Sequence, residues 1–184
     1  MNDQNTNLEK YKLKNVLREG WKRLPLIEDI ESVADHSWSL SILVLEFTPK
    51  EFDLSKCLAM AVLHDVPEVL VGDITPHDGI DKAEKHRREE QASHSLLPTH
   101  LQEIWKEYAE ALTPESKWVH LLDKVEMAIQ ALLYKKQYGA NTDEFLISTR
   151  QTLSKYQVHS QLPQSLQYLL IQIGVIPFSS TKID

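Results

Sequence analysis

Two histidines and two aspartates are the side chains in this sequence that could together hold a transition metal. His36 lies near the start of a helical pattern, His64 and Asp65 are adjacent and precede Pro67, and Asp123 lies within a long helical pattern. Imidazole and carboxylate ligands suit Mn, Fe, Co, Ni or Zn better than Ca or a metal that selects thiolates. Each residue alone has a simpler explanation, as a helix-start hydrogen bond, a common dipeptide or a surface ion pair. Their joint occurrence predicts a metal site.

Two further acidic residues follow the His64-Asp65 pair. Glu68 comes four residues after His64, so it lies on the same face if the helix continues that far. Gly72 permits a tight turn that presents Asp73 to the same cleft. A carboxylate beside a metal site is placed to take or give a proton. Without the metal site, Glu68 would be a solvated helix-end acid and Asp73 a turn residue; with it, both are candidate catalytic residues.

Helical spacing of apolar residues recurs along the chain and predicts the elements that must position these side chains. Only five glycines occur, and no clean period-2 alternation exceeds about four residues, which disfavours strands. Ser32, Asp53 and Thr113 are predicted to cap helices, and Gly20 and Gly139 to end them. The expected helices cover about residues 8–18, 32–47, 53–67, 81–97, 101–112, 113–138, 143–155 and 162–173. The predicted fold class is all-α, a single-domain helical bundle.

The composition limits the class of protein further. The chain has 184 residues, 42% hydrophobic and 26% charged, as in ordinary globular proteins. A net charge of −7 disfavours a general binder of nucleic-acid polymers, which needs a basic surface. The N-terminus has no apolar signal segment, and the longest apolar stretch is shorter than the roughly 20 residues that span a bilayer. The one cysteine, Cys57, suits a reducing compartment. We therefore expect a soluble, cytoplasmic protein with no membrane partner.

Several segments resemble the motifs of the HD-domain phosphohydrolases. Residues 31–38 are similar to the opening motif of that family, residues 64–68 with 72–74 to the central motif, and residues 122–126 to the third. Residues 84–90 and 105–108 are similar to one branch, the 5′-deoxynucleotidases that include the HD domain-containing protein 2-like and YfbR-like enzymes. The resemblance covers about residues 8–138, and its combined motifs are specific.

This resemblance implies an all-helical HD fold in which residues 1–184 form a single HD domain. The core motifs lie within about residues 8–138, and helices at about 143–173 complete the bundle. It also implies a homodimer that takes a small-molecule nucleotide as its substrate.

The activity implied by the resemblance is that of a metal-dependent phosphomonoesterase. It would hydrolyse deoxyribonucleoside 5′-monophosphates to deoxynucleoside and phosphate with a metal-activated water. One divalent transition metal is expected, Mn or Co, with Fe, Ni and Zn as further candidates. Its ligands would be His36, His64, Asp65 and Asp123.

The resemblance also assigns roles around the metal. Glu68 would be the catalytic carboxylate, and Asp73 would contact the sugar hydroxyl or assist the proton transfer. An arginine and a tryptophan that precede the first motif would bind phosphate and pack against the deoxyribose. One alignment places these roles on Arg18 and Trp21, whereas a second alignment selects Arg23. A buried core aromatic is the alternative explanation for Trp21.

Other interpretations remain open at this stage. The same metal site could serve another nucleotide, such as a nucleoside triphosphate, a cyclic nucleotide or an alarmone. A non-catalytic HD scaffold that binds a nucleotide or a protein is a third hypothesis. The basic residues 85–88 could face the cleft, or they could form a solvated helix face paired with neighbouring acids.

Overall fold

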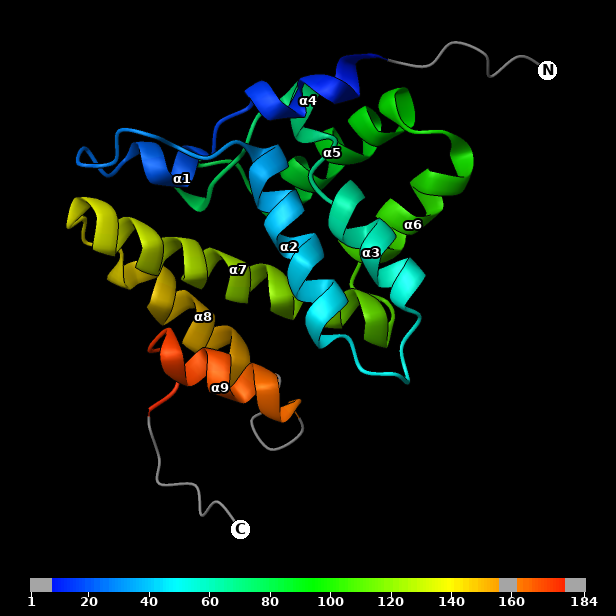
Figure 1. Cartoon of the computed structure of the whole chain (residues 1–184). Coiled ribbons are helices and arrows are strands. Elements are labelled where there is room, and N and C mark those ends of the chain that lie inside the picture. The colour runs from blue at the N-terminus through cyan, green and yellow to red at the C-terminus, as the bar shows by residue number, and fades with distance from the viewer. Residues whose placement is uncertain (1–7, 156–161, 178–184) are drawn as a thin grey trace.

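The computed structural model describes residues 8–155 and 162–177, and within this part the fold is helical (Figure 1). The expected single domain over residues 1–184 extends beyond these residues at both ends and at 156–161. The elements are η1 (Leu8–Asn15), α1 (Glu19–Lys22), α2 (Val33–Phe47), α3 (Leu54–Leu63), α4 (Glu68–Val71), η2 (Pro76–Asp78), α5 (Lys82–Leu96), α6 (Thr99–Ala109), α7 (Pro114–Tyr138), α8 (Asp143–Lys155) and α9 (Gln164–Gln172). The all-α prediction is confirmed.

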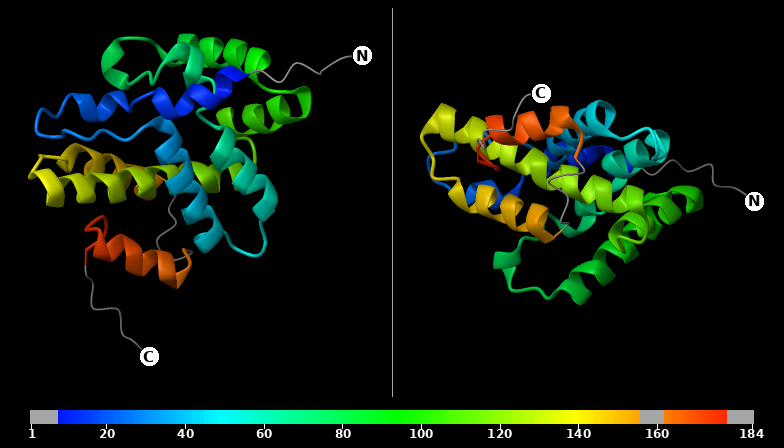
Figure 2. Two further views of the ribbon diagram at one scale, coloured as in Figure 1. Left: turned by 45° about the horizontal axis from the view of Figure 1, so that its top comes forward. Right: turned by 90° about the horizontal axis from the view of Figure 1, so that it is seen from below.

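The long helix α7 is the element around which the others are arranged. Helices α2, α3, α6 and α8 all contact it, and α2 crosses it (Figures 1 and 2). The main core lies where these helices meet, and fully buried Leu40, Met60, Leu122 and Leu166 bring α2, α3, α7 and α9 into it. A second apolar cluster joins η1, α5 and α6. Among the described residues, no helix combines the length and the apolar character needed to cross a membrane.

The N-terminal segment differs from the expected helix over residues 8–18. It forms the 3₁₀ helix η1, then an extended stretch, then the short helix α1, which contains Gly20 instead of ending before it. The reason is a competing backbone interaction. Leu17 and Ser32 form an isolated antiparallel bridge, and the N–H of Arg18 donates to the carbonyl oxygen of Glu31 at 3.1 Å. This pairing takes up backbone groups that a continuous helix would use, and it fixes Arg18 beside the start of α2.

The helix ends that position the predicted site follow local rules. Ser32 caps α2 by accepting from the N–H of Asp35, whose side chain accepts in return from the N–H of Ser32. Asp53 caps α3, and Thr113 begins α7 with a similar reciprocal pair. Gly139 ends α7 with φ +69°, a left-handed conformation that glycine adopts without a Cβ clash. These predicted boundaries are confirmed.

Replacing Ser32 with alanine tests whether this cap holds the start of α2. The variant loses the side-chain acceptor for the first turn, so we expect the free energy of unfolding to fall by about 1 kcal/mol. Urea denaturation measures the change. Ser39→Ala, in the middle of the same helix, is the control and should leave stability equal or slightly higher. Equal stability of Ser32→Ala and the wild type would contradict the role of the cap.

Candidate active site

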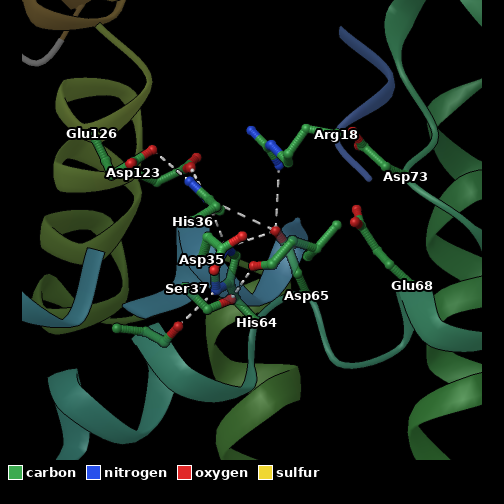
Figure 3. Close-up of polar contacts among 12 residues, drawn as sticks. Arg18, Asp35, His36, Ser37, His64, Asp65, Glu68, Asp73, Asp123 and Glu126 are labelled. Atoms are coloured by element: carbon green, nitrogen blue, oxygen red, sulfur yellow. Dashed lines mark hydrogen bonds and ion pairs between the residues drawn. The ribbon is translucent and has the colours of Figure 1, made fainter. Parts of the chain in front are cut away.

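The four predicted metal ligands lie together between α2, α3 and α7 (Figure 3). The Nε2 atom of His36 is 3.1 Å from Oδ1 of Asp123 and 3.3 Å from Nε2 of His64. The Nε2 atom of His64 is in turn 2.9 Å from Oδ2 of Asp65. Three separate elements therefore direct nitrogen and oxygen atoms at one small volume.

Local structure explains how each of these side chains reaches that volume. His36 lies in the first turn of α2, four residues after its cap. Helix α3 ends at Leu63, so His64 and Asp65 lie in the turn that follows. The indole Nε1 of Trp105 donates to the carbonyl oxygen of His64 at 2.9 Å and holds this turn against α6. Asp123 lies in the middle of α7 and is 9% exposed.

The far sides of both imidazole rings are occupied by acceptors. Nδ1 of His36 is 2.5 Å from Oε2 of Glu126, and Nδ1 of His64 is 2.9 Å from the carbonyl oxygen of Ala61. A ring nitrogen that faces an acceptor carries the proton in the neutral imidazole, so each Nε2 keeps its lone pair. Two Nε2 lone pairs and two carboxylates then meet in one place. This set of donor atoms fits a divalent transition metal.

The charges of the site also favour a cation. Although burial and the Arg18 charge oppose it, Glu126 and Asp123 raise the pKa of His36 to about 10. The site therefore attracts a second proton to this ring, and a metal ion bound at Nε2 would take the place of that proton. Burial alone would raise the pKa of Asp65, but the His64 imidazole and the charges of His36 and Arg18 hold that pKa well below its ordinary value. The pKa of Asp123 is likewise held well below its ordinary value, so Asp65 and Asp123 are stabilised in their ionised forms, which are the forms that bind metal.

A second group of potential ligand atoms consists of Glu31, His36 and Glu126. It would use Nδ1 of His36, which points away from the Nε2 atoms described above. The short contact between Nδ1 and Glu126 is the kind of outer contact that orients a metal-binding imidazole. Burial and the nearby Glu126 charge raise the pKa of Glu31 to about 7. We therefore interpret this group as support for His36 and not as a second metal site.

A cavity of about 690 Å³ opens over His64, Asp65 and Asp123, while His36 lies fully buried behind them. Its size falls within the usual range for small-molecule sites. Glu68 and Asp73 both line it, and Figure 3 shows them on the side opposite Asp123. Glu68 is 2% exposed, and burial together with the charges of Asp65 and Asp73 raises its pKa well above the ordinary value. A carboxyl group in that condition can carry a proton near neutral pH.

The structure separates the two candidate phosphate-binding arginines. Arg18 lies over the acidic cluster, with Nη1 3.6 Å from Oδ2 of Asp65 (Figure 3). The side chain of Asp73 accepts from the N–H of Glu19 at 2.8 Å and so fastens the segment that carries Arg18. Arg23 also lines the cavity, but it forms an ion pair with Glu144 at 3.2 Å, where both side chains are well exposed.

Trp21 lies in the cavity wall but is only 1% exposed. Its Nε1 donates to Oε1 of Glu31 at 2.7 Å, and its ring packs against Phe145 with 4.0 Å between centroids. Trp21 is therefore a buried core aromatic, as in the alternative explanation, and it also borders the cavity. Its contact with a deoxyribose stays a prediction.

Several residues of the site were not assigned a role from the sequence. Glu126 follows Asp123 by three residues, and this helical spacing could have indicated it. Tyr108 and His120 line the cavity and stack on each other with 3.9 Å between ring centroids. Helix α8 contributes Phe145 and Ser148, which no motif indicated. Of the basic residues at 85–88, the first two line the cavity, whereas Arg87 and Arg88 pair with Glu84.

Comparison with known proteins identifies the family. A family model described as HD domain matches residues 11–165. The chain belongs to the HD domain family. A protein from Schizosaccharomyces pombe named 5′-deoxynucleotidase hdd1 is 38% identical over 143 residues, which cover 72% of each chain. The resemblance found in the sequence motifs is thereby confirmed.

Solved structures share the fold of this HD-domain protein. A conserved hypothetical protein from Pyrococcus furiosus superposes with a TM-score of 0.76 at 28% identity and covers 92% of this chain and 97% of its own. An HD phosphohydrolase of cyanophage S-2L, DatZ, described as bound to dA and one catalytic Zn²⁺ ion, has a TM-score of 0.60 at 16% identity. That match covers 93% of this chain and 96% of the phage protein, and it shows the fold alone.

Replacing Glu126 with leucine tests whether this carboxylate orients His36. The change removes the acceptor at Nδ1 and puts an apolar side chain of similar size in its place, so we expect metal affinity to fall about 10- to 100-fold. Glu126→Gln keeps an acceptor and should lose less. Titration of metal-stripped protein with Mn²⁺ or Zn²⁺ measures the affinity.

Glu115→Gln, in the first turn of the same helix, is the matched control. Its carboxylate pairs with Lys56, away from the site, so metal affinity should be unchanged. Wild-type affinity in folded Glu126→Leu would show that Glu126 does not support the metal site.

Proposed function

We propose that this HD-domain protein is a metal-dependent 5′-deoxynucleotidase that hydrolyses deoxyribonucleoside 5′-monophosphates to deoxynucleoside and phosphate. The observation that carries the proposal is that Arg18, Glu68, His64, Asp65 and Asp123 line one cavity. His36 is buried in contact with Asp123 and His64 and completes the candidate ligand set. The S. pombe relative with that activity in its name supports the choice of substrate.

Arg18 supplies the fixed positive charge for the substrate phosphate. Its guanidinium already lies against Asp65, and the surrounding acids raise its pKa despite burial, so it stays charged. A guanidinium can bind two phosphate oxygens at once, which orients the phosphorus over the acidic cluster. Because its backbone is paired with Glu31, Arg18 needs little reorganisation to bind.

A divalent ion held by His36, His64, Asp65 and Asp123 would neutralise phosphate charge and make a water molecule more acidic. Hydrolysis would join a water oxygen to phosphorus and break the bond from phosphorus to the 5′-oxygen, and the proton lost by the water would replace the one that Glu68 gives up. Glu68 is placed to deliver a proton to the departing 5′-oxygen, since burial favours its protonated form. Mn or Co is our first expectation for the ion, with Fe, Ni and Zn as further candidates.

Roles for the sugar side follow from the cavity wall. We assign Asp73 to the sugar hydroxyl or the proton transfer. It lines the cavity, and the contact with the N–H of Glu19 uses only one of its two carboxylate oxygens, Oδ2. Trp21 would limit the space beside the deoxyribose with the small part of its ring that borders the cavity.

The proposal includes a cytoplasmic homodimer. The buried Cys57 thiol, whose pKa burial raises to about 11, has no sign of redox use and suits a reducing compartment. Trp38, Ile42 and Leu45 leave apolar surface exposed along one side of α2, which a second copy could cover. Light scattering and fractionation of cells test the two statements separately.

A panel of nucleotides tests the proposed reaction. We expect phosphate release from deoxyribonucleoside monophosphates with Mn²⁺ or Co²⁺, little release from ribonucleotides, and none with EDTA. Asp123→Ala should reduce kcat/KM by more than about 100-fold, since even outer-sphere changes at metal sites cost 10- to 100-fold. Asp143→Ala, which removes an exposed acid paired with Lys135, is the control.

Three outcomes would direct the assignment elsewhere. Pyrophosphate or triphosphate as the product would select a different nucleotide substrate. Full activity in Asp123→Ala or in EDTA would contradict the metal site, and a metal-free protein with no turnover of any nucleotide would favour a non-catalytic scaffold.

Alanine substitutions of Arg18 and Arg23 should have very different effects on kcat/KM. We expect Arg18→Ala to lower kcat/KM for a deoxynucleotide by about 100-fold, because a charged group that contacts the reacting phosphate is lost. Arg23→Ala removes only an exposed ion pair and should change kcat/KM by less than about threefold. Steady-state kinetics at saturating metal measure both. The reverse order would assign the phosphate to Arg23.

A further inference from the structure

The side chain of Glu68 makes few polar contacts, although it is expected to move a proton. Its side chain is buried, and its Oε2 atom has no hydrogen-bond partner among the described residues. It lies in the first turn of the short helix α4, next to the turn at Gly72. A carboxylate with so few contacts needs another group to fix its direction, because catalytic groups work only within a narrow range of positions.

Lys85 of α5 is the cation placed to do this. Its Nζ atom donates to the carbonyl oxygen of Ile74 at 2.9 Å and lies 3.4 Å from Oε1 of Glu89 and 3.9 Å from Oε1 of Glu68. The side chain is about one-third exposed and lines the cavity. Lys85 thus connects the candidate proton donor to the loop that carries Asp73.

The rest of α5 shows that this arrangement is particular to Lys85. Arg87 and Arg88 both pair with Glu84 on the outer face of the helix. Lys82 lies one turn before Lys85, also lines the cavity, and is exposed. The basic segment is therefore mainly a solvated face, and one of its charges is turned inward beside Glu68.

We infer that Lys85 is a positioning residue for Glu68: it holds the carboxyl group and the loop at 72–75 in the geometry that proton transfer needs. This inference rests on the proposed function. Ile74 and Glu89 fix the Nζ atom, and its charge attracts Oε1 of Glu68 across 3.9 Å. The other oxygen, Oε2, is then left for the reacting atoms.

A double-mutant cycle tests the inference. Lys85→Met keeps the aliphatic stem and removes the charge and the donor, so kcat for a deoxynucleotide should fall about 10- to 100-fold, part of the loss expected when a proton-transfer group is removed. KM and metal affinity should stay within about threefold. In the Glu68→Gln background, Lys85→Met should cost less than about twofold, because a group that acts through Glu68 has nothing left to act on.

Two further variants separate positioning from general structure. Lys85→Arg keeps a cation and should recover much of kcat, and it also serves if Lys85→Met does not fold. Arg87→Met, on the outer face of the same helix where Arg87 pairs with Glu84, should leave kcat within about twofold of wild type.

Three results would overturn the inference. Losses in Lys85→Met and Glu68→Gln that multiply would show that Lys85 acts independently, and a raised KM with unchanged kcat would make it a phosphate ligand. Unchanged kcat in Lys85→Met or in Glu68→Gln would remove the role altogether. The proposed function is judged separately by Asp123→Ala, so a metal-dependent enzyme with an inert Lys85 would leave that proposal standing.

Discussion

The arrangement of this protein depends on one electrostatic constraint: several electron-pair donors are buried at the same point. Nε2 of His36 lies 3.1 Å from a carboxylate oxygen of Asp123 and 3.3 Å from Nε2 of His64. Such a set is costly to bury unless positive charge accompanies it. Two kinds of contact in the surrounding structure offset this cost. Glu126 and the Ala61 carbonyl fix the imidazole rings from behind, and Arg18 brings a permanent charge over the acids.

The same constraint explains how a protein with a net negative charge could bind a phosphate substrate. The net charge of −7 is not spread evenly with respect to the cavity. Acids form its floor, and Arg18 and Lys85 approach that floor from two different elements, the extended N-terminal segment and α5. A broad basic surface is unnecessary, because charge that is fixed and partly shielded from water acts more strongly than the same charge in solvent. For binding a phosphate, the placement of these charges in the cavity therefore matters more than the net charge of the chain.

The sequence predicts the fold and the centre of the site better than it predicts the outer wall. Caps such as Ser32 and Thr113 and the stop at Gly139 are local signals, so the boundaries of α2 and α7 could be read directly. The segment at 8–18 could not, because its backbone pairs with residues far along the chain at the Leu17–Ser32 bridge. Similarly, nothing local distinguishes Lys85 from the solvated basic residues beside it.

This division between local and distant signals has a functional consequence. The residues proposed for the chemistry lie within the motif region, where spacing along α2, α3 and α7 determines their geometry. The wall that faces the rest of a substrate is assembled differently: α8, beyond the motif region, contributes Glu144, Phe145 and Ser148. Substitutions in that wall can change which base or sugar fits without disturbing the four buried ligand candidates, since α8 makes none of their contacts described above. Part of the wall that would face the base or sugar thus lies outside the short motifs and is seen only in the assembled cavity, whereas the four metal-ligand candidates could be inferred from the motifs.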